Sequence, residues 1–209
     1  MSTSKITSSL SSKTDYSKLL PDCVKPDINV LFVGINPGEH TAKNRHHYAG
    51  PHNHFWTCLF ESGLVDQKYT SNEDYLLPKT KYKIGLTNIV KRPTKTAAEL
   101  SENELKLGAI DLLKLLSSCR AKIIVFNGMV VFRTFLKHAL NLERKIWNSK
   151  IVYGRQPDYM KDCVIFAMPS SSPRAALFPA ARDKTPFYVA IREMVEELES
   201  ENENETNCE

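Results

Sequence analysis

Short apolar runs recur along the chain and predict four buried β-strands. Each is rich in β-branched or aromatic residues and is continuously apolar, which is typical of strands covered on both faces. A fifth, weaker run at residues 146–154 predicts an edge strand or hairpin. The four strong runs are Asn29–Gly34, Lys83–Ile89, Ala121–Asn127 and Cys163–Met168.

Between these runs, apolar residues recur at helical spacing. The helix that begins at Ser101 opens with Ser-x-x-Glu, a capping box. Alternation of short strands with helices predicts an α/β fold: a single-domain α/β/α sandwich with a short, mainly parallel central sheet. We expect the domain over residues 23–192, between a Ser/Thr-rich N-terminal tail (1–22) and an acidic C-terminal tail (193–209). The predicted helices are Asn53–Leu64, Ser101–Leu116, Met129–Leu140 and Arg182–Glu199.

Length and composition fit one domain and exclude some classes of protein. The chain has 209 residues, and none of its apolar runs approaches the roughly 20 residues that span a bilayer, which argues against a membrane protein. The five cysteines are widely spaced without a CxxC pair, as expected for reduced thiols inside a cell. Residues 1–18 lack the hydrophobic core of a secretory signal.

The net charge of +4 is unevenly distributed. Residues 193–209 hold eight acidic side chains and no Lys or Arg, so residues 1–192 carry +12. A cationic body with an acidic tail is common among proteins that bind nucleic acid. Scattered lysines that keep a protein soluble give the same balance, and on charge alone that second interpretation is the better one.

The unusual loops all follow predicted strands. They are Gly34–Gly38 (GINPG), Asn88–Thr94, Asn127–Gly128 and Pro169–Arg174. Because ligand sites collect at the carboxyl ends of parallel strands, we expect these loops to share one cleft.

The histidines suggest a pocket rather than a metal site. Five of the six lie between His40 and His54, but their spacing matches no metal-binding motif, so no metal is expected. A loop that lines a pocket fits better, with Asn53 capping the next helix and Tyr48 free to stack on a planar ligand.

Five sequence blocks together resemble one family. GINPG, GPHNHFW, TNIVKRPT, VFNG and MPSSSPR occur in the order and spacing of the mismatch-specific uracil/thymine DNA glycosylases, a branch of the uracil-DNA glycosylase superfamily. The resemblance runs from about Val30 to Tyr188. It implies a monofunctional DNA glycosylase that flips uracil, and more slowly thymine or other damaged pyrimidines, out of mismatches with guanine and removes the base by hydrolysis, starting base excision repair.

The same resemblance implies roles for residues of the cleft. Asn36 would hold the attacking water and Thr94 would help to place it. A neutral amide cannot act as a general base, but it can orient water through hydrogen bonds. Asn88 would contact the flipped pyrimidine. The remaining residues of the base pocket would be Ile35, His47, Tyr48 and Asn53.

On the DNA side, the resemblance implies a loop that grips phosphates and fills the gap left by the flipped nucleotide. Arg174 would be the wedge. Backbone groups around Pro173 would read the orphaned guanine. The other members of this set are Asn127, Ser170, Ser171 and Ser172.

The resemblance also implies the partners. Double-stranded DNA with a G·U or G·T mismatch or a damaged base is the expected substrate, without cofactor or metal and without a membrane. A monomer is expected, in the nucleus where the substrate is, followed by an abasic-site endonuclease. The resemblance does not cover the acidic tail; a separate hypothesis is that residues 193–209 repel DNA and hasten release of the abasic product.

Two alternatives stay open. A DNA-lesion binding module with little turnover would keep the pocket and the wedge. A small-molecule enzyme on a nucleotide-binding α/β fold is disfavoured because the Gly-rich phosphate fingerprint is missing.

Overall fold

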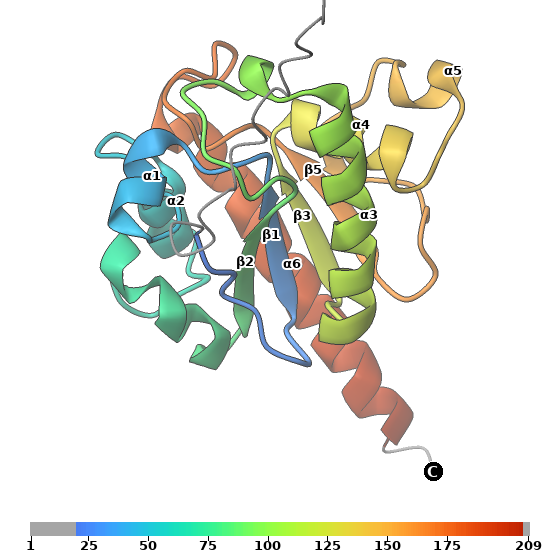
Figure 1. Ribbon diagram of the computed structural model, residues 1–209. Helices are drawn as coiled ribbons and strands as arrows, with labels where there is room; N and C mark the ends of the chain where they lie inside the picture. The colour runs from blue at the N-terminus through green and yellow to red at the C-terminus, as the bar shows by residue number, and fades with distance from the viewer. Residues whose placement is uncertain (1–19, 207–209) are drawn as a thin grey trace, which may run out of the picture.

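The computed structural model describes residues 20–206 and shows a central sheet between two layers of helices (Figure 1). The sheet order is β2-β1-β3-β5-β4, parallel throughout except for β4, which pairs antiparallel with β5. The α/β sandwich with a mainly parallel sheet is therefore confirmed. The strands are β1 (Val30–Gly34), β2 (Ile84–Asn88), β3 (Ile123–Asn127), β4 (Gly154–Arg155) and β5 (Val164–Met168).

The helices form the two outer layers and several connections. In Figure 1, α3 and α4 lie in front of the sheet and α6 crosses behind it. Four of the eight helical segments in residues 20–206 were not expected from the sequence: the α-helices α1 and α5 and the 3-10 helices η2 and η3. The segments are α1 (Glu39–Asn44), α2 (Phe55–Glu61), η2 (Ser71–Lys79), η3 (Ala97–Glu99), α3 (Glu102–Cys119), α4 (Met129–His138), α5 (Arg144–Trp147) and α6 (Ala181–Thr206).

Each central strand buries both of its faces, which explains the continuous apolar runs. In β1, Leu31 and Val33 pack into the core formed with α3 and α4. Val30 and Phe32, which alternate with them, pack into the core on the side of α2 and α6. Burial on both faces leaves the strand ends as the places where polar side chains can gather.

The strand order places the site. The chain moves from β1 to β2 on one side and then crosses back to β3 on the other side of β1. Loops that leave neighbouring strands in opposite directions open a crevice at the carboxyl edge of a parallel sheet. The GINPG loop, which follows β1, lies at this point.

The segment predicted as an edge strand at residues 146–154 folds differently. Its first part lies in α5, and only Gly154–Arg155 pairs with the sheet. Glu143 and Asn148 flank a single helical turn. Its apolar residues Ile146 and Trp147 gave this segment the sequence pattern of a strand.

The acidic segment is partly built into the fold. The expected boundary between residues 192 and 193 falls inside α6, and Val195 is 1% exposed in the core. Glu199 Oε1 accepts a hydrogen bond from Asn29 Nδ2 at 2.8 Å. The first residues of this segment therefore pack against the sheet.

Most of the expected N-terminal tail, residues 1–19, lies outside the described residues. The last part of that tail is packed: Leu20 is buried, and Asp22 is bonded by Lys91 Nζ at 2.6 and 2.7 Å. Within residues 20–206, none of the helices has the length and apolarity needed to cross a membrane.

Candidate active site

One cleft of about 880 Å³ brings the four post-strand loops together. It lies at the carboxyl ends of β1, β2, β3 and β5, as the parallel sheet predicts. Every residue that the sequence analysis selected lines it. These residues are Ile35, Asn36, His47, Tyr48, Asn53, Asn88, Thr94, Asn127, Ser170, Ser171, Ser172, Pro173 and Arg174.

Asn36 and Thr94 are brought together because the chain keeps pairing beyond β1 and β2. Gly38 and Thr94 form a parallel bridge, and the Thr94 N–H donates to the Pro37 carbonyl at 3.1 Å. Asn36 Nδ2 then lies 2.7 Å from Thr94 Oγ1. The two residues are 58 positions apart in the chain, and their contact is the direct result of this loop pairing.

The hydrogen bonds fix the orientation of the Asn36 amide. Nδ2 lies 3.0 Å from the Arg92 carbonyl and 3.3 Å from the Pro37 carbonyl, and a carbonyl can only accept. The Thr94 hydroxyl donates its single proton to the Thr96 carbonyl at 2.7 Å, so toward Asn36 it is an acceptor. The amide nitrogen is therefore saturated by protein acceptors.

The opposite atom of that amide is available. Asn36 Oδ1 has no hydrogen-bond partner among the described residues, and Asn36 lines the cleft. An acceptor held rigidly by its own nitrogen can bind and orient one water molecule there.

Asn88 lies beside this point at the end of β2. Its side chain fits because residue 34 is a glycine: a Cβ at Gly34 would lie 2.3 Å from Asn88 Oδ1. Asn88 is buried, and its side-chain amide makes no hydrogen bond to any described residue. The amide is thus free to pair with a polar ring that enters the cleft.

The loop before α2 forms the apolar wall of the cleft. Tyr48 stacks on Phe55 with ring centroids 4.0 Å apart. Burial raises the pKa of Tyr48 to about 12, so the phenol is neutral at physiological pH. Asn53 Oδ1 accepts from the Phe55 N–H at 3.0 Å, but the N-cap of α2 is His54 and not Asn53 as expected, because the helix begins one residue later.

His47 is held as a neutral structural ring. Its Nε2 donates to the Pro21 carbonyl at 2.9 Å, and burial lowers its pKa. Its backbone N–H donates to Asp74 Oδ2 at 2.8 Å, and His46 Nδ1 lies 3.0 Å from Asp74 Oδ1. Asp74, a buried carboxylate on η2, therefore holds the pocket loop in place, a role that no sequence pattern predicted.

The serine loop is anchored to β3 by a reciprocal pair. Asn127 Nδ2 donates to Ser171 Oγ at 2.9 Å, and the Ser171 N–H donates to Asn127 Oδ1 at 2.8 Å. Ser171 is 1% exposed and Asn127 is also buried, so these two residues anchor the serine loop to β3 from its buried side. The half-buried Ser170 and Ser172 border the cleft, and Arg174 is exposed at its rim.

Two further groups shape the site without having been selected from the sequence. Arg92, whose carbonyl holds Asn36, donates to Glu104 Oε1 at 2.5 Å and Oε2 at 3.1 Å. Lys184 on α6 is completely buried behind the serine loop. Among the described residues, no group of three or more His, Cys, Asp or Glu side chains could hold a metal ion.

The sequence was also compared with models of known protein families. The model of the uracil DNA glycosylase superfamily matches residues 21–195. The chain belongs to the uracil DNA glycosylase superfamily. The matched span contains the whole sheet and every residue of the cleft described above.

One curated relative of this superfamily member is a protein of Schizosaccharomyces pombe (strain 972 / ATCC 24843) named G/U mismatch-specific uracil DNA glycosylase. The two are 31% identical over 160 residues, which are 75% of this chain and 48% of the relative. The chain thus spans about half the length of that relative.

The fold has a solved counterpart. The solution NMR structure of a candidate uracil DNA glycosylase from Methanosarcina acetivorans superposes with a TM-score of 0.53 at 16% sequence identity, covering 84% of this chain and 98% of that one. At this identity the likeness concerns the fold.

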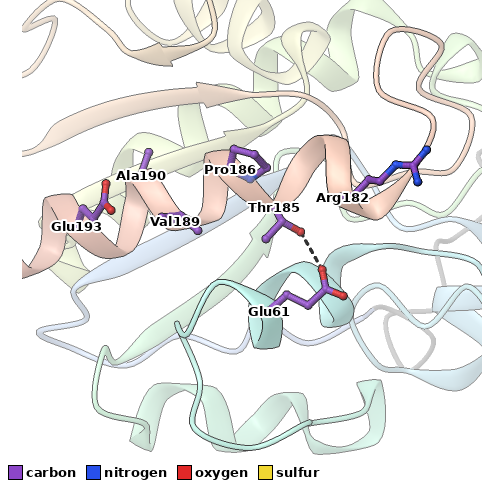
Figure 2. A pocket seen from close by; sticks show the side chains of 7 residues that line it. All are labelled: Glu61, Arg182, Thr185, Pro186, Val189, Ala190 and Glu193. Carbon is purple, nitrogen blue, oxygen red and sulfur yellow. Dashed lines mark hydrogen bonds between the residues drawn. The ribbon is translucent and has the colours of Figure 1, made fainter.

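A second hollow of the uracil DNA glycosylase domain lies away from the cleft, between α2 and α6. Its volume is about 450 Å³, and Thr185 Oγ1 donates across it to Glu61 Oε2 at 3.0 Å (Figure 2). None of the selected site residues lines it. The lining residues are Glu61, Arg182, Thr185, Pro186, Val189, Ala190 and Glu193.

Proposed function

We propose that this protein is a monofunctional DNA glycosylase that removes uracil from G·U mismatches by hydrolysis. The observation that carries the proposal is the Asn36 amide in the cleft, whose nitrogen is saturated by Thr94 and the Arg92 carbonyl while its oxygen has no hydrogen-bond partner among the described residues. Membership of the uracil DNA glycosylase superfamily and the name of the fission yeast relative support the same activity.

In the proposed mechanism, Asn36 Oδ1 accepts a hydrogen bond from the attacking water. The amide is not basic enough to remove a proton from that water, so the rate depends on how far the glycosidic bond has already broken. The sugar develops oxocarbenium character, and the base leaves as an anion. The free Asn88 amide is placed to donate to this anion and stabilise it.

The same reasoning makes thymine the slower substrate. An enzyme without a strong base depends on the leaving group, and uracil leaves more easily than thymine because it lacks the electron-donating methyl group. We expect single-turnover excision from G·U duplexes to be faster than from G·T duplexes, and equal rates would contradict this dependence.

On the DNA side, the exposed Arg174 enters the duplex in place of the flipped nucleotide, and the half-buried Ser170 and Ser172 meet the flanking phosphates. Asn127 and Ser171 act from beneath, through the reciprocal hydrogen bonds that shape the loop.

The proposed reaction leaves the abasic site uncut. Lys95 lines the cleft but is exposed, and Lys184 has its Nζ engaged with a carbonyl and an imidazole. Borohydride treatment during the reaction should therefore trap no protein–DNA cross-link, and a cross-link at Lys95 would contradict this part of the proposal. An abasic-site endonuclease would act next.

The proposal includes a monomer that works in the nucleus. The support for a monomer is that residues of a single chain complete the cleft. The support for the nucleus is the location of the DNA substrate.

The deciding experiment incubates the protein with a G·U duplex, cleaves abasic sites with alkali and measures strand breaks. The native protein should produce breaks and Asn36→Ala should lose at least about 100-fold in single-turnover rate, since the water loses its positioning group. Asn72→Ala, which changes an exposed asparagine on η2, is the matched control. Tight binding without breaks by the native protein would favour the lesion-binding module.

A further inference from the structure

Lys184 is a charged side chain in a place where charges are rare. It projects from α6 and is 0% exposed. A lysine buried this completely is normally paired with a carboxylate or closely hydrogen-bonded. No ion pair joins Lys184 to a carboxylate within residues 20–206, so its polar contacts must account for its burial.

Those contacts join the two loops of the proposed active site. Lys184 Nζ donates to the Ser172 carbonyl, in the serine loop, at 2.7 Å. The same nitrogen lies 3.0 Å from Nδ1 of His54, the N-cap residue of α2 at the end of the pocket loop. A third link runs parallel to these, from the His54 N–H to the Ser171 carbonyl at 3.0 Å.

The chemistry of the contact sets the charge of His54. An ammonium has only donors, so Nδ1 must accept and the imidazole must be neutral. Burial and the adjacent Lys184 charge both lower the pKa of His54, and burial lowers the pKa of Lys184. Protonation of His54 would place two positive groups against each other and would break the bond.

The surroundings offer little compensation. Cys58, one turn along α2, is the nearest titratable group of that helix, and its Sγ donates to the Ala181 carbonyl at 3.5 Å. Farther along α2, Glu61 is bonded to Thr185. On α6, Asp183 Oδ2 accepts from the Ala180 N–H at 2.9 Å. The Asp183 charge raises the pKa of both His54 and Lys184, but burial outweighs it and the pKa of each is lowered.

We propose that Lys184 is a positioning residue that locks the serine loop to the base-pocket loop through His54, and that protonation of His54 releases this lock at acidic pH. The inference rests on the proposed function, because it assigns to the lock the alignment of the gripped phosphates with the flipped base. Alignment of this kind governs the rate, since small displacements of a reacting group are costly.

The first test measures hydrogen exchange of the free protein and does not depend on activity. In Lys184→Met, amides of residues 168–176 and 50–58 should exchange faster than in the native protein, while those of β1 and β3 should not change. Lys68→Met, at an exposed lysine, is the control. Unchanged exchange in both loops would overturn the proposal.

The second test separates positioning from general stability through pH. Native excision of uracil should fall as the pH drops through the pKa of His54, which burial and Lys184 hold below the free value of 6.5. His54→Asn keeps an acceptor near the position of Nδ1 but cannot titrate, so it should flatten the acid side of the profile. An unchanged acid side in this variant would overturn the pH-dependent release.

At pH 7.5, Lys184→Met should lower the maximal single-turnover rate by about 10- to 100-fold, the scale of a lost hydrogen bond from a charged group. If Lys184→Met does not fold, His54→Ala removes the same bond more mildly and should show the same faster exchange. A native protein that excises no uracil would contradict the proposed function, while the exchange experiment would still decide the role of Lys184.

Discussion

Asn36 owes its character to what surrounds its nitrogen. Two backbone carbonyls and a threonine oxygen, all acceptors, lie within 3.3 Å of Nδ2. Because all three are acceptors, they bind an NH₂ group at this position and would repel an oxygen atom there. The residue is therefore an asparagine for a structural reason as well as a chemical one.

Replacing Asn36 by Asp tests whether these three acceptors require a donor at this position. One carboxylate oxygen would face the Arg92 carbonyl, and the hydrogen bonds donated by Nδ2 would be lost, so the water would lose its fixed acceptor. We expect Asn36→Asp to excise uracil at least about tenfold more slowly at pH 7.5, as expected from the loss of one or two hydrogen bonds. Asn72→Asp should keep the native rate. A faster Asn36→Asp enzyme would show that basicity at this position outweighs the contacts of the amide.

Site residues could be predicted from the sequence where they belong to a recognisable sequence motif. The loops at the strand ends that carry Asn36, Asn88 and Thr94 could be predicted to meet at one edge of the sheet, and the resemblance to the mismatch-specific glycosylases selected these residues within them. The reciprocal bonding of Asn127 and Ser171 could not be foreseen, since it joins positions 44 apart. The structural roles of Lys184 and Asp74 could not be predicted. A polar residue in a predicted helix, or in a segment without a predicted element, is expected to face solvent.

Elements held by packing were predictable, and those held by local polar contacts were not. The expected strands agree with β1, β2, β3 and β5 to within two residues at either end, because burial on both faces leaves a continuous apolar run. The turn η2 was not expected: its sequence SNEDYLLPK contains a proline and has little periodicity, and a capping box between Thr70 and Glu73 begins it.

One connection between elements makes the site sensitive to acid. Glu104 belongs to the capping box of α3 and also binds Arg92, whose guanidinium lowers the pKa of Glu104 to about 2. A carboxyl group with a lowered pKa stabilises the fold fully above its ordinary value of 4.5, and this contribution is lost as the pH falls toward 2.

We therefore expect Glu104→Gln to lower the melting temperature at pH 7 and to matter progressively less below pH 4.5. The loss at pH 7 should be about 1 kcal/mol, or about 2–4 °C, since both side chains are partly exposed and solvent weakens the pair. Glu197→Gln, at an exposed carboxylate of α6 that forms no ion pair with any described residue, is the control. A difference that persists unchanged at pH 2.5 would contradict the assignment to this ion pair.

The C-terminal helix is the second element whose role the structure redefines. Val195 is buried, and Tyr82 donates its hydroxyl proton to Glu196 Oε1 at 2.5 Å. A chain that ends after Arg192 should therefore lose at least about 1.5–3 kcal/mol from Val195 alone and melt several degrees lower. A chain that ends after Ser200 should melt like the native protein. Equal melting of the two truncations, followed by circular dichroism, would show that the end of α6 adds no stability.

At the scale of the whole molecule, the cleft and the acidic end of α6 lie at opposite edges of the sheet. The cleft opens at the carboxyl edge of the sheet, whereas α6 runs past the other edge and carries the acidic residues away from it (Figure 1). Five residues of parallel strand span about 17 Å. At physiological ionic strength the screening length is about 8 Å. The acidic end of α6, which stops at Thr206, is therefore too distant to repel DNA bound at the proposed site except in dilute salt.

Truncation after Ser200 tests this geometry without disturbing the core. It removes Glu201, Glu203, Glu205 and Glu209 and raises the net charge from +4 to +8. At 150 mM salt, affinity for an abasic duplex should change by less than about twofold, because the end of α6 lies more than one screening length from the cleft. At about 10 mM salt the screening length is about 30 Å, and the truncated protein should bind more tightly. Tenfold tighter binding at 150 mM, measured by fluorescence anisotropy, would mean that the acidic segment lies against the DNA in the complex and acts in product release.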